Sequence, residues 1–85
     1  PFNPSTTIAY SITPPGAASE HVRLVIYDLH GREVSVLVDD WQVVGEYEVE
    51  FDASGLASGV YFYELQLRQG NTLQRSQIRK MILMK

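Results

Sequence analysis

Alternation of apolar and charged residues with a period of two is the feature that most restricts the fold of this chain. From residue 45 to residue 52, the apolar residues Tyr47, Val49 and Phe51 alternate with acidic residues. Successive side chains of a β-strand point to opposite faces, so this pattern predicts a strand with one buried face and one wet face. No segment shows the apolar repeat at three and four residues that an amphipathic helix needs. The chain is therefore expected to be all-β.

Turn-forming residues divide the rest of the chain into further strands. Asn3-Pro4, the cluster Thr13-Pro14-Pro15-Gly16 and the pair Gly70-Asn71 break the apolar pattern, and Gly31 allows the positive φ of a hairpin turn. Residues 39–42, which include Trp41, are expected to be a polar connection. The expected strands are Thr6–Ile12, His21–Leu29, Arg32–Val38, Gly45–Asp52, Val60–Arg68 and Thr72–Met84, the last long enough for one bent strand or two.

About seven short antiparallel strands with turns every 8 to 12 residues or so are typical of an immunoglobulin-like or fibronectin-like β-sandwich. The spacing Leu56-x-x-Gly59-x-Tyr61 is that of a tyrosine corner, in which a tyrosine hydroxyl folds back onto the preceding backbone. We therefore expect Tyr61 to be a structural core residue.

Size and composition limit the classes of function. A chain of 85 residues supports one core, so residues 1–85 are expected to form a single domain. The net charge of −3 argues against nucleic acid as a partner. The chain has no cysteine and no apolar run of membrane-spanning length. It opens on Pro1 without a methionine, which suggests a piece of a longer polypeptide.

The acidic row on the fourth strand is the first place where chemistry could occur. Carboxylates about 7 Å apart along one strand face could serve a glycosidase or bind calcium. The alternative is a solvated strand face whose charges discourage edge-to-edge pairing. The alternative is favoured, because a calcium site usually takes its ligands from a loop that wraps the ion. The row consists of Glu46, Glu48, Glu50 and Asp52.

Other candidate residues have equally plain structural interpretations. His21 and His30 lie at opposite ends of one expected strand, about 30 Å apart, so they cannot share a metal site through it. The Ser-Gly pairs at 54–55 and 58–59 lack the strand-to-helix setting of a nucleophile. Trp41 could stack on a sugar if exposed, or cover the end of a sandwich if buried. We expect no catalytic residue, no metal and no cofactor.

The carboxyl-terminal residues are the most distinctive candidates for recognition. Four of the seven cationic residues lie between positions 75 and 85, and they frame a short apolar run. An exposed terminal strand offers backbone hydrogen-bonding groups to a receptor, and flanking cations fix its register. The same cations could also meet an anionic lipid or lipopolysaccharide head group. The residues expected to take part are Lys80, Met81, Ile82, Leu83, Met84 and Lys85.

Four ordered blocks of the chain resemble the type A C-terminal sorting domain of the type IX secretion system, also called the Por secretion system. They are Pro1-Phe2-Asn3-Pro4-Ser5-Thr6-Thr7-Ile8, the segment 25–34 with Tyr27-Asp28-Leu29-x-Gly31-Arg32, the segment 55–63 with Gly59-Val60-Tyr61, and Arg79 to Lys85. An immunoglobulin-like domain of the flagellar hook-capping protein shares the middle blocks.

The resemblance implies a non-enzymatic signal at the end of a secreted cargo protein. The cargo would cross the inner membrane by its own signal peptide, and the outer-membrane translocon would recognise the sorting domain in the periplasm. A sortase-like cell-surface peptidase would remove the domain and attach the cargo to anionic lipopolysaccharide. The resemblance makes the terminal strand and the turn glycines Gly31 and Gly59 the residues that matter for recognition or for the recognised shape.

Two other outcomes remain open from the sequence. One is a structural or carbohydrate-binding accessory module of a multidomain extracellular enzyme, which an exposed Trp41 among polar side chains would favour. The other is self-association through an open sheet edge. The location implied by the resemblance is the cell surface or the medium.

Overall fold

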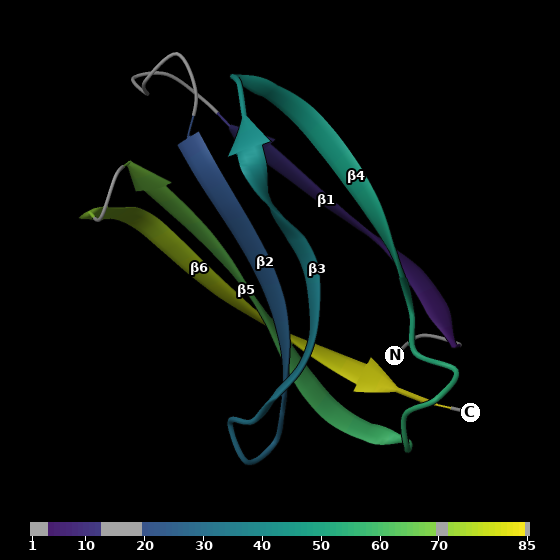
Figure 1. Ribbon diagram of the computed structural model, residues 1–85. Helices are drawn as coiled ribbons and strands as arrows, with labels where there is room; N and C mark the ends of the chain where they lie inside the picture. Colours follow the sequence, from purple (N-terminus) through teal and green to yellow (C-terminus); the bar gives the residue numbers. More distant parts are fainter. Residues whose placement is uncertain (1–3, 13–19, 70–71, 85) are drawn as a thin grey trace.

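The computed structural model describes residues 4–12, 20–69 and 72–84, and within these ranges every regular element is a strand. The chain is therefore all-β, as the alternating pattern predicted. The part described contains no helix that could cross a membrane. The six strands are β1 (Ser5–Ile12), β2 (Glu20–Asp28), β3 (Glu33–Gln42), β4 (Gly45–Asp52), β5 (Gly59–Gln69) and β6 (Thr72–Leu83) (Figure 1).

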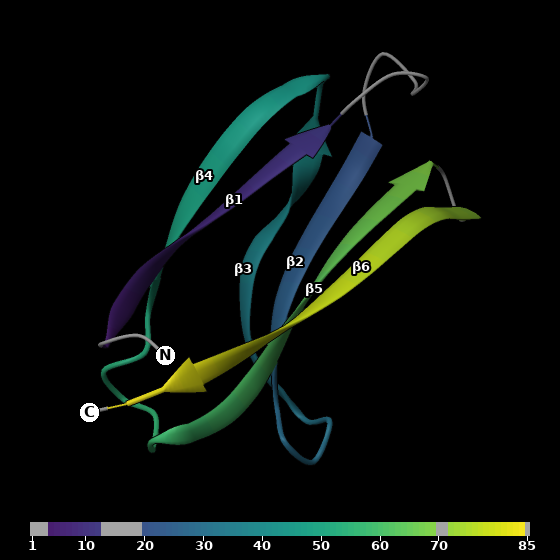
Figure 2. The ribbon, with the colours of Figure 1, turned by 180° about the vertical axis from the view of Figure 1, so that it is seen from behind.

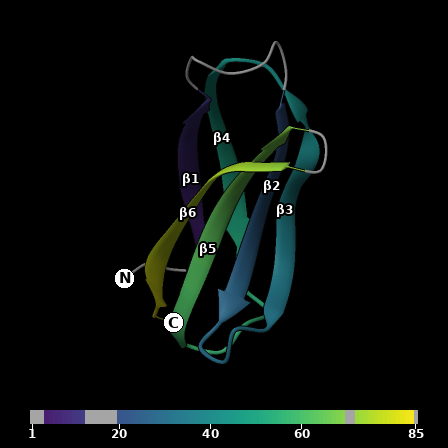
Figure 3. The same cartoon turned by 90° about the vertical axis from the view of Figure 1, so that its left-hand side faces the viewer.

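The strands form two antiparallel sheets that pack as a sandwich. The larger sheet has the order β3-β2-β5-β6, and the smaller one consists of β1 and β4 (Figures 2 and 3). In the smaller sheet the register pairs Ile8 with Val49 and Thr7 with Glu50. Apolar side chains of both strands therefore face the larger sheet, whereas the acidic row faces water.

The core lies between the two sheets and is centred on β2. Val22, Leu24 and Ile26 of this strand are fully buried, as a central strand with neighbours on both sides requires. Burying each such side chain contributes roughly 1.5 to 3 kcal/mol relative to leaving it exposed. The opposite sheet and the flanking strands supply the rest of the core, which includes Ile8, Ile12, Phe51, Tyr61, Leu65, Leu67 and Leu83.

Val25 is also fully buried, although it belongs to the outward-facing row of β2. The guanidinium of Arg23 reaches along the strand to the carboxylate of Glu33, with nitrogen to oxygen distances of 3.1 and 3.2 Å. Val25 lies between these residues in the ladder. The aliphatic stem of an arginine covers apolar surface in this way while its head stays in water.

A pair of tyrosines helps to join the sheets at the end where β1 finishes. The hydroxyl of Tyr10 donates to Gln42 Oε1 on β3 at 2.6 Å, and its ring stacks on Tyr47 of β4 at a centroid distance of 5.4 Å. Burial raises the pKa of Tyr10, and the hydrogen bond to Gln42 only partly opposes this effect.

The main correction to the expected elements concerns residues 39–42, which were expected to be a connection. They continue β3 instead, because β2 provides a register partner for each of them, from Asp39 opposite Arg23 to Gln42 opposite Glu20. Polar residues are tolerated here since β3 is an edge strand with one side open to water. The final segment forms one long strand rather than two. The turn clusters 13–16 and 70–71 lie outside the described residues.

The first and last strands meet at one end of the sandwich. β1 begins and β6 finishes there, together with the hairpin turn that joins β2 to β3 (Figures 1 and 2). At this end, Ala53 N–H donates to the carbonyl of Pro4. β1 and β6 run in opposite directions, each at the edge of its own sheet.

Candidate recognition site

Among the strands that the structure describes, the terminal strand β6 has a hydrogen-bonding partner on one side only. It pairs with β5 from Gln69 opposite Thr72 to Gly59 opposite Leu83, and it is the last strand of the larger sheet. The outer edge of such a strand carries backbone N–H and C=O groups that point away from the sheet. These groups form a template on which another strand can pair.

The two faces of β6 have different roles. Leu83 is 1% exposed and belongs to the core, and Met81 packs against that core. Ile78, by contrast, is 63% exposed on the opposite face, and Ile82 is also exposed. The inward row therefore anchors the strand, and the outward row presents apolar side chains together with Lys80. Lys85 lies outside the described residues.

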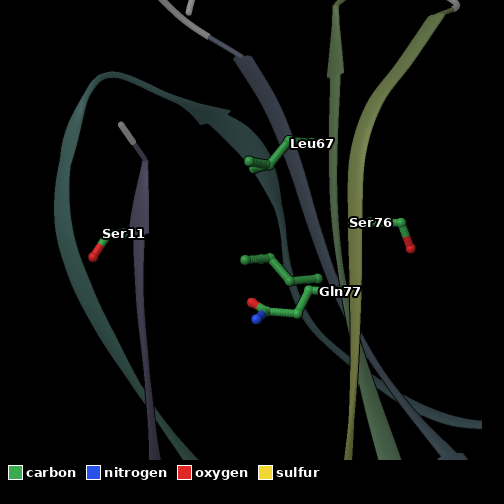
Figure 4. Close-up of a pocket in the computed structure, with 5 residues that line it drawn as sticks. Ser11, Leu67, Ser76 and Gln77 are labelled. Atoms are coloured by element: carbon green, nitrogen blue, oxygen red, sulfur yellow. The ribbon is translucent and has the colours of Figure 1, made fainter. Parts of the chain in front are cut away.

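The side of the sandwich between β6 and β1 is open. A hollow of about 440 Å³ there is bordered by residues 6–9 of β1, by Tyr63 and by residues 80–82. A second hollow of about 390 Å³ is lined by Ser11, Leu65, Leu67, Ser76 and Gln77. Figure 4 shows Leu67 and Gln77 pointing into the space between the strands, whereas Ser76 points to the other face.

Charge is distributed unevenly between the sheets. The segment from residue 72 to residue 85 has no acidic residue, and neither Arg79 nor Lys80 makes an ion pair with any described residue. The smaller sheet presents the acidic row of β4 instead. The edge offered by β6 is thus basic as well as unpaired.

Glu64 of β5 connects β6 to the rest of the sheet through side chains. Ser76 Oγ donates to one carboxylate oxygen at 2.7 Å, and Gln66 Nε2 and the Tyr27 hydroxyl donate to the other at 2.8 and 3.3 Å. Desolvation raises the pKa of Glu64, but the three hydrogen bonds and the positive charge of Arg23 together outweigh it, so the pKa lies below its ordinary value. The sequence analysis did not predict this cluster. The feature that could have indicated it is the presence of an acidic residue, Glu64, in the aromatic-rich strand β5.

The hairpin turn between β2 and β3 depends on Asp28 and Gly31. One Asp28 carboxylate oxygen accepts the backbone N–H groups of His30 and Arg32 at 2.9 and 3.0 Å, and the other accepts Arg32 Nε at 2.9 Å. The hydrogen bond from the Arg32 backbone is the largest of several effects that lower the Asp28 pKa. Gly31 has φ of 80°, a conformation that favours glycine.

Tyr61 folds back onto the crossover that precedes its strand. Its hydroxyl donates to the carbonyl of Ala57 at 2.8 Å, and its ring belongs to the core. This is the geometry of a tyrosine corner. Gly59, two residues earlier, has φ of 152° and lies opposite Leu83, so this corner also borders the end of β6.

The structure does not assemble the other candidate residues into a catalytic or metal centre. Among the described residues, no group of three His, Asp or Glu side chains could hold a metal ion. His21 pairs with Asp39, whereas His30 lies in the hairpin turn. A hollow beside Glu46 and Glu48 is bordered by Tyr10 and Tyr47. The hydrogen bond from Ser54 N–H to Asp52 lowers the pKa of that carboxyl at the end of the row.

The described residues thus form an all-β sandwich whose edge strand β6 is basic and unpaired on its outer side. The family described as the secretion system C-terminal sorting domain matches residues 1–83, and this chain belongs to that family of type IX sorting domains. The domain is a C-terminal sorting signal, which directs secretion across the outer membrane to the cell surface or beyond. No curated protein and no solved structure shows a significant match to the chain.

Proposed function

We propose that the outer-membrane translocon recognises this domain through the free edge of β6, by adding a strand of its own. The observation that carries this proposal is the unpaired edge of β6 beside the open side of the sandwich. Main-chain hydrogen bonds supply affinity in this mode, and pockets for alternate side chains supply specificity. The residues proposed for contact are Lys80, Met81, Ile82, Leu83, Met84 and Lys85.

These residues are proposed to have two roles, anchoring the strand and contacting the receptor. Met81 and Leu83 face the core and hold the strand in place, while Lys80 and Ile82 present charge and apolar surface to the receptor. Gly31, Gly59 and Tyr61 act on the shape that is recognised, because they set the hairpin turn and the corner at the same end of the sandwich.

The wider route is also proposed, and it rests on the family resemblance. The cargo precedes the domain and crosses the inner membrane by its own signal peptide, and the domain meets the translocon in the periplasm. A sortase-like surface peptidase then removes the domain and anchors the cargo to anionic lipopolysaccharide. In this scheme the domain is a substrate and performs no catalysis of its own.

Self-association through β6 would compete with the translocon for the same edge. Pairing two copies of β6 would bring the cations of both strands together, and like charges across a strand pair are destabilising. We therefore expect the monomer to be favoured in dilute solution and at low salt, where screening is weak.

A fluorescent reporter fused in front of residues 1–85 tests the proposal in a bacterium with a working type IX system. Reversing two charges on the edge, by Arg79→Glu with Lys80→Glu, should leave the reporter in the periplasm. The control Glu46→Lys with Glu48→Lys also reverses two exposed charges, but on β4 of the smaller sheet, away from β6, and should be exported like the wild type. Export of the edge variant at the wild-type level, with the translocon present, would refute recognition through this edge.

A further inference from the structure

Trp41 lies on the outer face of the larger sheet, far from the terminal strand. It is 55% exposed, on the edge strand β3 at the opposite side of the sheet from β6. The register places His21 of β2 beside it and Arg68 of β5 beside His21. An exposed indole does not gain the stabilisation that burial would provide, so Trp41 contributes little to the core. Its side chain is instead available to a ligand on the surface.

The surroundings of Trp41 are polar and held in place. The His21 imidazole meets the indole nearly edge-on, with centroids 5.4 Å apart and planes at 69°. His21 Nε2 is 2.9 Å from Asp39 Oδ1. The backbone N–H of Trp41 donates to Asp40 Oδ1 at 2.8 Å. His21 thus contacts both the indole and the carboxylate and places the three groups side by side, an arrangement that lowers the entropic cost of binding a ligand.

We propose that Trp41, His21 and Asp39 form a saccharide-binding platform that takes a pyranose ring of a polysaccharide. One face of such a ring carries C–H groups with partial positive charge, which suit the negative face of an indole. Hydroxyl groups at the ring edge can donate to the second oxygen of Asp39 and bond to the remaining nitrogen of His21.

The position of the platform fits a polymer better than a small metabolite. The side chain of Asp39 is 56% exposed, so the platform is open to solvent. An open surface can take one unit of a long chain, whereas small-molecule sites are usually enclosed. The platform lies at the β3 edge of the larger sheet, and β6 is the strand at its other edge. This inference therefore does not depend on how the domain is recognised for export.

The test is an NMR titration of the 85-residue chain with cellohexaose, maltohexaose and mannohexaose, following the indole N–H and the backbone amides. At least one probe should give saturable shifts centred on Trp41 and His21. Trp41→Ala should weaken that binding by about tenfold or more, which corresponds to about 1.4 kcal/mol. Trp41→Tyr should keep part of it, and Asp39→Asn should weaken it without unfolding the domain.

Val43→Ala is the matched control, because Val43 is an equally exposed apolar residue two positions away, and its binding should equal that of the wild type. The inference is overturned if no probe gives a saturable shift, if the shifts centre elsewhere, or if folded Trp41→Ala binds as well as the wild type. Dispersed amide spectra for each variant establish that it is folded.

Discussion

Ser76 of the terminal strand donates a hydrogen bond to Glu64 of the neighbouring strand, with 2.7 Å between Oγ and Oε2. The same carboxylate accepts hydrogen bonds from Tyr27 and Gln66. One acidic group thus links β2, β5 and β6 on the outer face of the larger sheet. The strand proposed to meet the translocon is held by this group as well as by its backbone ladder and the burial of Leu83.

Ser76→Ala should lower the free energy of unfolding by about 1 kcal/mol, because it removes a hydrogen bond to a partly shielded carboxylate. Urea denaturation measures the effect. Combining it with Glu64→Gln should show a coupling of at least roughly 0.5 kcal/mol, since the two residues share one interaction. Strictly additive effects would mean that the bond contributes nothing to stability.

The stability of the domain should fall as the pH drops below the ordinary glutamate pKa of 4.5. The pKa of Glu64 is lowered by folding, so its contribution is present above that value and is lost as the pH falls through the folded-state pKa. Melting temperatures measured from neutral to acidic pH should show a smaller acid loss for Glu64→Gln than for the wild type. Glu48→Gln controls for net charge, and an equal acid loss in both variants would contradict the assignment.

Tyr61→Phe should cost about 1 kcal/mol of unfolding free energy, because the carbonyl of Ala57 loses its hydrogen bond beside a buried ring. Tyr47→Phe is the matched comparison, since its hydroxyl makes the same contact to the carbonyl four residues earlier, Val43, at an exposed position. Water can replace that bond, so the loss should be smaller. A melting temperature unchanged in Tyr61→Phe would rule out a stabilising corner.

Gly31→Ala should destabilise the hairpin by about 1 kcal/mol, because its φ of 80° is unfavourable for a residue with a Cβ atom. No neighbouring atom would touch the added methyl group, so the effect isolates backbone strain. Gly55→Ala provides the control: its site is equally open and its φ is not positive. Equal melting temperatures for the two variants would count against strain at Gly31.

Leu83→Ala should cost about 2 to 5 kcal/mol, the usual range for emptying a buried leucine site. This prediction affects how a deletion of residues 80–85 should be interpreted. Such a deletion removes a core residue as well as the edge, so it should abolish export partly by unfolding the domain. Limited proteolysis separates the two causes, because an intact fold in the deleted protein would show that Leu83 is dispensable.

Much of the fold could be predicted because burial leaves a period-two signature. The strand Gly45–Asp52 has the expected bounds, since one of its faces is apolar and the other is entirely acidic. The extension of β3 through Trp41 could not be predicted, because its polar residues carry no alternation. Those residues are strand only because β2 provides backbone partners for them.

Part of the candidate site could also be predicted, because its charge pattern is local in the sequence. Cations around an apolar run at Lys80 to Leu83 are visible in the sequence, and a terminal strand was expected from them. Which edge stays unpaired depends on strand order, which long-range pairing decides. The hydrogen bond from Tyr27 to Glu64 joins residues 37 positions apart, and no local pattern marks such a contact.

The meeting of the first and last strands at one end of the sandwich has a mechanical consequence. In the proposed function the cargo precedes β1 and the translocon holds β6, so tension between cargo and translocon would act on these two strands. Because β1 begins and β6 finishes at the same end of the sandwich, such tension would break the hydrogen bonds of the β1–β4 and β5–β6 ladders one after another from that end. It would not load all the bonds of a ladder together in shear. Breaking bonds in sequence needs less force than shearing a whole ladder, so β1 and β6 are expected to be the first strands to separate under tension.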